Sequence, residues 1–390
     1  MLSLGNNITS SPSTESKYGL ILDGTGDFLD TGHHFSTVFN DSFTISFWAK
    51  PTDGHATQTF FGSNDGDADL IRGEIKGSGD FKLTFEGNGD PGTYQTSDVV
   101  FSDGQATSWT HILVTATKAS STAIAVYVNG VSVTTENGGG GVSETNHAAF
   151  SSAQNLAIGA NNDQGTVGAN FTGGIDEFAI FNVALDADAA AAVYNSGRPF
   201  NLNFDRGNYD NSSALQAYYK MGNGPFDDKL NGIVHDAHNP GFGSELVSDA
   251  DFSQENAFWG TETGWTFDVS AKTAGYNGGS PTRALSQNRE VITTGKIYIL
   301  SFTVVNYQSG TVVGCLSSGD VTGNTPDITA NGDYSFTLIA TGGLLLFRST
   351  STSPGSTPGF LGSIKNPSLK ELSGLPGATS GNPIFSSDAP

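Results

Sequence analysis

The segment from Thr172 to Pro199 reads TGGIDEFAIFNVALDADAAAAVYNSGRP and holds both a strand pattern and a helix pattern. Apolar residues in IDEFAIF predict a strand. The alanines that follow favour a helix, with Asp186 as its N-cap and Gly197 near its C-terminal end. We therefore expect one short helix appended to a domain made of strands.

The acidic pair Asp176-Glu177 lies inside that expected strand and could be catalytic, could bind a metal, or could only close a fold. Adjacent residues of a strand point to opposite faces of the sheet. We therefore expect the two carboxylates to point apart, which makes them a poor catalytic pair.

Short alternating stretches recur through the rest of the chain. FTISFWAK, HILVTATK and AIAVYVNG alternate apolar and polar residues, and Asn129-Gly130 favours a tight hairpin turn before VSVTT. The chain has 51 glycines and 26 phenylalanines, and only 14% of its residues are charged. Many short strands joined by turns predict an all-β protein built from antiparallel sandwiches.

The patterns divide the 390 residues into five parts. We expect an N-terminal arm at 1–16, a first β-sandwich at 17–200, a connector at 201–243, a second β-sandwich at 244–372 and a flexible C-terminal tail at 373–390. The tail is assigned on its Gly, Pro and Ser content.

The net charge of −22 argues against nucleic acid as a partner, because the 17 Lys and Arg residues are scattered. The acidity fits either simple solubility or cation binding. No apolar run is long enough to span a membrane, and the N-terminus does not resemble a secretory signal. We expect Cys315 to be a buried core thiol.

Five segments of the first half resemble laminin-G-like, concanavalin-A-like lectin domains. They are LILDGTGDFLDTG, FTISFWAKP, SWTHILVT, AVYVNGVSV and LAIGANN with the closing FTGGIDEFAIFNVALDADAAAAVYNSG. Their order matches the family's, and the resemblance covers about residues 17–200. It implies a concanavalin-A-like jelly roll for the first domain.

The second half resembles galactose-binding-like jelly rolls, a fold used by many carbohydrate-binding modules. The similar segments are ELVSDADFSQENAFWGTETGWTF, GKIYILSFTV and GSIKNPSLKEL. The family pattern closes on an acidic residue where this chain has Lys365, so a ligand role at that position is not carried over.

The order of the two modules resembles virion proteins of tailed bacteriophages, marine ones especially. The resemblance implies a structural protein, made in the host cytoplasm, that decorates the capsid or tail at the virion surface. Its expected partners are other virion proteins, host surface glycans and further copies of itself. The alternative is a bacterial adhesin or extracellular polysaccharide-binding protein.

We do not expect an enzyme. Related sandwiches include glycosidases with an E-x-D-x-x-E strand, which would place two carboxyls at the ~5–5.5 Å that retaining hydrolysis needs. That pattern is absent, as are G-x-S-x-G and HExxH, and His235 and His238 form only a lone i, i+3 pair. A glycoside hydrolase is the least favoured reading.

A structural Ca²⁺ is expected from Asp23, Asp27 and Asp176. In the resembled domains the first turn lies beside the closing strand, so carboxylates of LDGTGD could share an ion with Asp176. The alternative is an Asx-turn, with Asp176 capping backbone amides.

Two further features are candidates for carbohydrate binding. Asp65, Asp67 and Asp69 alternate as EF-hand ligands do, but Leu70 and Lys76 replace the Gly and Glu of that loop, which excludes an EF-hand. The loop is either a polar turn or an acidic Ca²⁺ or glycan site.

The second candidate is aromatic. Trp259, in a Gly- and Thr-rich segment, could be an exposed platform for a sugar ring. Trp48, Trp109 and Trp265 are expected in the core.

Overall fold

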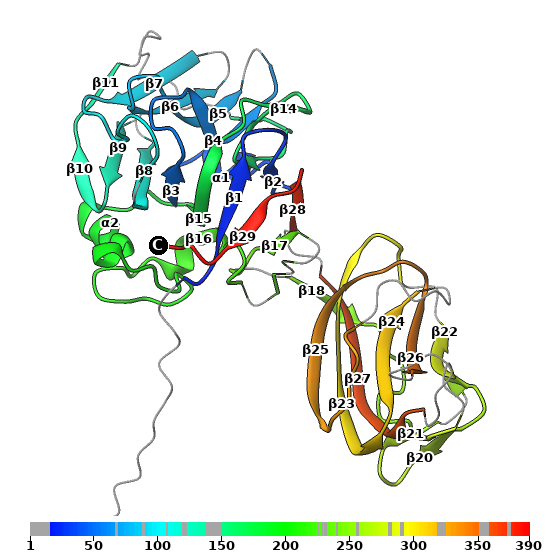
Figure 1. Cartoon of the computed structure of the whole chain (residues 1–390). Helices are drawn as coiled ribbons and strands as arrows, with labels where there is room; N and C mark the ends of the chain where they lie inside the picture. Colours follow the sequence, from blue (N-terminus) through cyan, green and yellow to red (C-terminus); the bar gives the residue numbers. More distant parts are fainter. Residues whose placement is uncertain are drawn as a thin grey trace, which may run out of the picture. The chain divides into compact units, whose positions relative to one another are not determined.

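The computed structural model describes residues 16–390 apart from 67–68, 88–89, 107, 119–122, 138–149, 225, 228, 230–231, 239–240, 255–256, 280–282, 289–291, 318–324, 351–358 and 373–375. The chain forms two compact units (Figure 1). Unit 1 comprises Met1–Pro240 and Leu375–Pro390, and unit 2 comprises Gly241–Gly374. Both are built almost entirely from strands, as predicted.

The first sheet of unit 1 has eight strands that pair in an antiparallel manner. Its central strand is β15, which pairs with β1, β3 and β16. In spatial order the strands are β10 (Val131–Val133), β9 (Ala123–Val128), β8 (Thr110–Thr117), β3 (Phe43–Pro51), β15 (Thr172–Phe181), β1 (Gly19–Asp23) and β29 (Ile384–Ser386), with β16 (Leu215–Tyr219) also paired to β15.

The second sheet of unit 1 has eleven strands, and only the β13–β4 pair is parallel. In spatial order they are β11 (Thr135–Asn137), β7 (Asp90–Thr96), β6 (Phe81–Gly87), β5 (Leu70–Ile75), β4 (Gln58–Asn64), β12 (Ala157–Ile158), β2 (Phe28–Asp30), β28 (Pro376–Ser380) and β17 (Ile233–His235), with β13 (Asn161–Asp163) pairing to β4 and to β14 (Thr166–Gly168).

A phenylalanine-rich core fills the space between the two sheets. The ring of Phe47 lies 5.0 Å from that of Phe60 and 5.9 Å from that of Phe178, which brings the two sheets into contact. Ile45 and Phe47 belong to this core, as the alternation in FTISFWAK predicts. Burial of these side chains is the main force that holds the sandwich together.

The expected helix is present as α2 (Ala187–Tyr194). Asp186 caps it, because its Oδ1 accepts a hydrogen bond from the Ala189 N–H at 2.8 Å. The helix ends before Gly197, since Asn195 already has a left-handed φ of 47°. Other helical turns among the described residues include α1 (Ser36–Phe39), η1 (Asn195–Gly197) and η2 (Ser212–Ala214).

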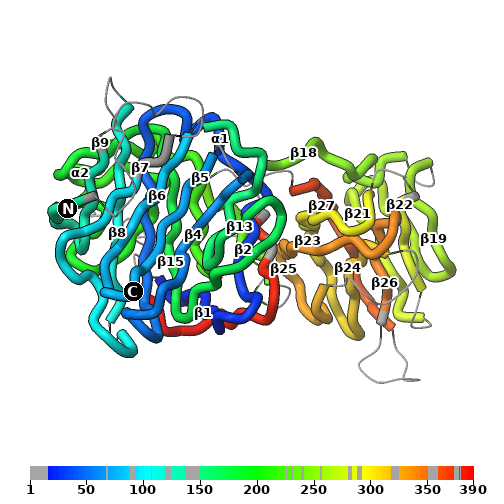
Figure 2. The backbone as a smooth tube through the Cα atoms, turned by 90° about the horizontal axis from the view of Figure 1, so that it is seen from above, coloured from blue at the N-terminus to red at the C-terminus, as the bar shows by residue number. Residues whose placement is uncertain are grey.

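The C-terminal residues form part of unit 1, which corrects the prediction of a flexible tail. Strand β28 pairs with β2 and β17, and β29 pairs with β1. Figures 1 and 2 show these red strands beside the blue N-terminal ones. The predicted connector also joins unit 1, because β16 and β17 both pair within its sheets.

Unit 2 is a second sandwich with its own core, which includes Trp265, Phe302 and Phe347. Its six-stranded sheet contains β20 (Trp265–Asp268), β21 (Thr273–Asn277), β27 (Leu361–Leu372), β23 (Ile297–Ser309) and β25 (Gly332–Ile339), with β18 (Phe242–Glu245) paired to β27. Its four-stranded sheet contains β19 (Trp259–Thr261), β22 (Ala284–Asn288), β26 (Leu344–Thr350) and β24 (Thr311–Leu316).

Unit 2 is therefore inserted between two paired strands of unit 1. The chain leaves after β17 and returns at β28, and inside unit 2 the residues Phe242 and Leu372 lie opposite each other. Because opposed residues of paired strands lie ~5 Å apart, a short linker could take the place of residues 242–372.

Replacement of residues 242–372 by a short Gly/Ser linker should leave unit 1 folded. We expect its thermal unfolding, followed by near-ultraviolet circular dichroism, to stay within a few degrees of the corresponding transition of the full chain. Residues 241–374 alone should also unfold cooperatively, because they have their own core. Failure of the excised chain to fold would contradict this division.

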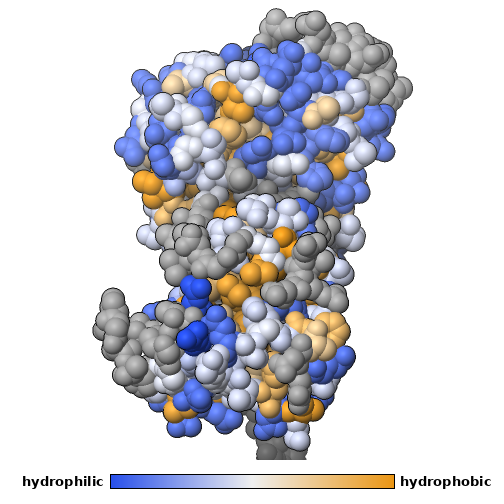
Figure 3. Space-filling model, turned by 90° about the vertical axis from the view of Figure 1, so that its right-hand side faces the viewer, coloured by the Kyte–Doolittle hydropathy of each residue, from blue (hydrophilic) through white to orange (hydrophobic). Residues whose placement is uncertain are grey.

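Strongly exposed large apolar side chains come from separate segments among the described residues. They are Val99, Val131, Phe204, Phe242, Val269 and Ile384. Figure 3 shows small groups of hydrophobic side chains among hydrophilic ones on one face. No helix in the described ranges is both long and apolar enough to cross a membrane.

Candidate functional site

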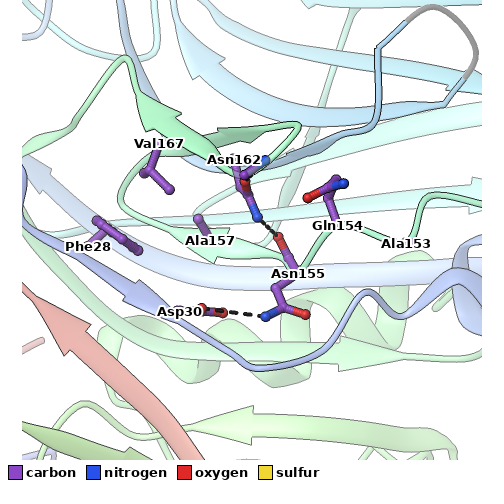
Figure 4. A pocket seen from close by; sticks show the side chains of 9 residues that line it. Phe28, Asp30, Ala153, Gln154, Asn155, Ala157, Asn162 and Val167 are labelled. Carbon is purple, nitrogen blue, oxygen red and sulfur yellow. Dashed lines mark hydrogen bonds between the residues drawn. The ribbon is translucent and has the colours of Figure 1, made fainter.

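A cavity of about 370 Å³ lies on unit 1, on the face of the second sheet that points away from the core (Figure 4). Strands β2 and β12 lie beneath it, and the β13–β14 hairpin and the residues before β12 surround it. The lining residues are Phe28, Asp30, Ala153, Gln154, Asn155, Ala157, Asn162, Gly165 and Val167.

Strand alternation places the residues on the floor of this pocket. Leu29 is fully buried in the core between the sheets, so its neighbours Phe28 and Asp30 point to the opposite face. Ala157 lies directly across from Asp30 in the β2–β12 pair. Because alanine is small, it leaves space in front of the Asp30 carboxylate.

The β13–β14 hairpin holds one wall in place. It turns through Gln164 and Gly165, whose φ angles of 50° and 83° are both left-handed. The Gly165 N–H donates to Asn162 Oδ1 at 3.0 Å, and Asn162 Nδ2 donates to the Asn155 carbonyl oxygen at 2.9 Å. These bonds fix the hairpin against the loop that carries Asn155.

The Asp30 carboxylate is held at one oxygen and more loosely at the other. Its Oδ1 accepts a hydrogen bond from the Gly32 N–H at 2.8 Å, whereas Oδ2 receives only a long bond of 3.4 Å from Asn155 Nδ2. Oδ2 can therefore accept a shorter bond from a bound molecule.

The pocket has an apolar side and a polar side. Phe28 and Val167 lie toward one end, and Gln154 and Asn155 lie toward the other, with Asp30 below (Figure 4). An aromatic ring beside a carboxylate and side-chain amides suits a small molecule with a C–H face and several hydroxyl groups. The volume lies within the range of small-molecule sites, ~300–1,000 Å³.

The acidic loop predicted to bind glycans supports the hairpin but does not line the pocket. Asp69 is buried and accepts a hydrogen bond from Ser151 Oγ at 2.7 Å, and Asp65 donates its N–H to the Asp69 carbonyl oxygen. Burial and the Asp69 charge raise the pKa of Asp65. Asp67 lies outside the described residues. The neighbouring Asn64 carbonyl accepts from the Gln164 N–H at 2.8 Å.

The three aspartates predicted to share a calcium ion do not come together. Asp27 is buried, and its carboxylate accepts from the Asp23 N–H at 3.0 Å and from the Asn382 N–H at 2.7 Å. Asp23 lies opposite Thr172, and Asp176 is four residues further along β15, which is ~13 Å.

These carboxylates therefore do not fit a shared calcium ion. No three His, Cys, Asp or Glu side chains in the described ranges are grouped to hold a metal. The Asx-turn of the alternative is present, because Asp23 Oδ1 accepts from the Thr25 N–H at 2.7 Å. Asp176 Oδ1 accepts from one backbone amide, that of Glu177, at 2.8 Å, and Asp27 accepts from two others.

Trp259 is not an exposed platform, which corrects that prediction. Its side chain lies in the core of unit 2, at 1% exposure, against Phe252 and Phe347. Its Nε1–H donates to the Asp249 carbonyl oxygen at 3.1 Å. The ring is thus unavailable to a sugar.

The pair Asp176-Glu177 lies at a β-bulge, so the expectation that its carboxylates point to opposite faces is wrong. The register with β3 shifts between Asp176 and Ala179, and Glu177 has a left-handed φ of 49°. Ile175 and Phe178 both belong to the core between the sheets. The extra residue therefore leaves both acids on the outer side of the sheet.

Both acids of this bulge are nevertheless buried, at 0% and 4% exposure. Asp176 Oδ2 accepts from Ser16 Oγ at 2.7 Å, and Glu177 accepts a hydrogen bond from the Tyr218 hydroxyl. Lys220 Nζ lies 3.9 Å from Glu177 Oε1. Burial raises the pKa of Glu177 to about 7, and burial and the Glu177 charge raise the pKa of Asp176.

The residues of the pocket were missed by sequence reasoning. Asp30 and Asn155 are 125 positions apart and meet through the β2–β12 pairing and the backbone bond between Thr31 and Leu156 that continues it. The amide-rich turn NNDQG from Asn161 to Gly165 was the one local signal, since side-chain amides and a glycine turn mark a polar hairpin.

Residues 23–191 match a family model, Laminin_G_3, of the concanavalin A-like lectin/glucanases superfamily. Unit 1 has a concanavalin A-like lectin fold. The pocket belongs to this fold, because every residue that lines it falls inside the matched range. No significant match is found among curated proteins.

Several solved structures show a weak similarity. The sialidase carbohydrate-binding module CBM40 of Ruminococcus gnavus, bound to α2,3-sialyllactose, is 17% identical, covering 46% of this chain and 97% of its own, with a TM-score of 0.37. A putative carbohydrate-binding protein from Bacteroides ovatus is 18% identical (58% and 57% covered, TM-score 0.36). Tailspike protein 2 of an Escherichia coli O157:H7 bacteriophage is 15% identical (55% and 31% covered, TM-score 0.35). Such values say nothing of a shared ligand.

Proposed function

We propose that this protein is a non-enzymatic, lectin-like carbohydrate-binding protein, and that unit 1 binds a glycan in the pocket over β2 and β12. The observation that supports this most directly is the pairing of Phe28 with Asp30 and Asn155 around one cavity of about 370 Å³. A pyranose offers the matching surfaces, because its C–H face packs on an aromatic ring while its hydroxyls hydrogen-bond to carboxylates and amides.

The absence of catalysis is part of the proposal. The one acidic pair singled out as a catalytic candidate, Asp176-Glu177, is buried beneath Tyr218 and Ser16 and cannot reach a glycosidic bond in this conformation. The pocket itself contains a single carboxylate, Asp30, whereas acid–base glycoside hydrolysis uses two.

An Ala153→Trp variant tests the site. Ala153 is exposed and lines the pocket, so an indole there should fill the cavity without disturbing the core. We expect glycan-array binding to fall to background while the melting temperature is unchanged. Val131→Trp, at an exposed position on β10 outside the pocket, is the matched control and should bind as the wild type does. Equal binding by both variants would place the site elsewhere.

We further propose that the protein works at the surface of a tailed bacteriophage particle. The support is the order of two sandwich modules, which resembles phage virion proteins, and the alternative is a bacterial adhesin. Other virion proteins and further copies of this chain would then be its partners. Mass spectrometry of purified particles tests the proposal: stoichiometric amounts of the chain in washed virions would support it, and its absence there would exclude it.

A further inference from the structure

We infer that the pocket over β2 and β12 selects uncharged sugars, and that Asp30 is the residue that rejects sugars carrying a carboxylate. This inference rests on the proposed glycan binding at the same site. It goes further by naming the chemical class of the ligand and the residue that sets it.

The charge of the pocket carries the inference. Asp30 is the only ionisable residue among the nine that line the cavity, and Lys, Arg and His are absent from that set. Proteins recognise sugar carboxylates with cationic side chains or with arrays of free N–H donors. The pocket offers a negative charge where such a ligand would need a positive one.

The hydrogen bonds of the wall point the same way. The Gly165 N–H donates to Asn162 Oδ1, and Asn162 Nδ2 and Asn155 Nδ2 each donate one N–H to groups of the protein. The donors left for a ligand are neutral side-chain amides, so no lining residue brings a positive charge to the cavity. Asp30 Oδ2 has only a long bond of 3.4 Å and is free to accept a better one. A hydroxyl can donate to this oxygen, whereas an ionised carboxylate cannot.

A neutral hexose and its uronate differ only at C6, where a carboxylate replaces a hydroxymethyl group. The pair therefore differs in charge and in one hydroxyl donor, and Asp30→Asn separates these two effects. Two like charges within one partly enclosed site repel by an amount that corresponds to about a tenfold loss of affinity. The same carboxylate would also lose hydration on entry without gaining a cation. We therefore expect at least a tenfold preference for the neutral member of each pair.

The experiment uses the full chain and an array that carries matched neutral, uronate-containing and sialylated glycans. Titration calorimetry then compares the best neutral binder with its uronate counterpart. Asp30→Asn keeps an acceptor for the Gly32 N–H but removes the charge. It should reduce the ratio of affinities for the neutral glycan and its uronate counterpart to a few-fold. Asp163→Asn removes one charge from the same hairpin, outside the pocket lining, and should leave the preference unchanged.

The outcomes separate the inference from the proposed function. A preference for neutral glycans that is lost in Asp30→Asn and kept in Asp163→Asn supports the proposed glycan binding and the charge selection. Acidic glycans that bind the wild type as well as neutral ones do would overturn the charge selection while leaving glycan binding intact. Wild-type binding that Ala153→Trp does not reduce, or no signal in any series, would overturn the proposed function and the inference with it.

Discussion

Deletion of residues 376–390 is expected to lower the melting temperature of unit 1 by more than ~10 °C or to prevent its folding. These residues form β28 and β29, which complete both sheets of the sandwich. Their loss removes several backbone hydrogen bonds and uncovers buried apolar surface. We estimate a cost of at least ~5 kcal/mol, which is comparable with the whole stability of many domains.

Side chains far apart in the sequence explain why the effect should be large. Asp388 accepts from Lys50 Nζ at 2.8 Å and from Trp109 Nε1 at 3.2 Å. The buried carboxylate of Asp27 accepts from the Asn382 N–H, so the deletion would leave one of its oxygens without that donor.

Point variants keep this prediction testable if the truncated chain does not fold. Asp27→Ala removes the bonds to the Asp23 and Asn382 amides and should lower the unfolding free energy by ~2 kcal/mol in chemical denaturation. Asp388→Ala, at an exposed position, should cost less than ~1 kcal/mol. A truncated chain with the melting temperature of the wild type would show that β28 and β29 contribute little to the stability of unit 1.

The sequence predicted those elements whose pattern is local. FTISFWAK and AIAVYVNG became β3 and β9, and the hairpin at Asn129-Gly130 formed with φ angles of 50° and 73°. Helix α2 formed behind its Asp186 cap. In each case a few neighbouring residues determine the structure, either by alternation or by turn and cap chemistry.

The elements missed by sequence reasoning depend on distant partners. The segment from Pro376 to Ser386 lacks apolar alternation. It is held in place by backbone pairing and by the carboxylates of Asp27 and Asp388, which leave no periodic signal in the sequence. The bulge at Glu177 changes the direction of one side chain, and a regular alternation cannot reveal an extra residue. The pocket is set by β2 and β12, strands of three and two residues, which are too short to show a period.

The buried acids of the bulge contribute stability to unit 1 that is lost as the pH rises from about 4 to about 8. Buried His111, whose pKa burial lowers to about 3, contributes in the opposite direction up to its unfolded value of ~6.5. Burial raises the pKa of Glu177 to about 7, and burial and the Glu177 charge raise that of Asp176, whereas both groups titrate near 4 in an unfolded chain. Between pH ~4 and pH ~7 the folded state therefore binds more protons at these two acids than the unfolded state does. Stability from Glu177 is therefore fully present below pH ~4 and is lost as the pH passes ~7, on the order of 3 kcal/mol.

Glu177→Gln should remove the Glu177 contribution to this pH dependence and make unit 1 at least as stable as the wild type at pH 8. The amide oxygen can still accept from the Tyr218 hydroxyl, and no charge has to be buried. Glu74→Gln is the matched control. Glu74 is equally buried, at 4% exposure, but its carboxylate lies 3.1 Å from Arg72 Nε, 3.6 Å from Lys76 Nζ and 3.7 Å from Lys82 Nζ.

The two substitutions should therefore change the unfolding free energy of unit 1 in opposite directions at pH 8. Loss of the Glu74 charge leaves three cations without their shared partner and should destabilise unit 1, whereas loss of the Glu177 charge relieves a buried acid that lies beside another acid and 3.9 Å from one lysine. Urea unfolding of the chain without residues 242–372, at pH 5 and pH 8, measures the change in unfolding free energy that each substitution causes. Equal destabilisation by both variants at pH 8 would show that Glu177 is held as a paired, ionised group and that its burial does not favour the protonated form.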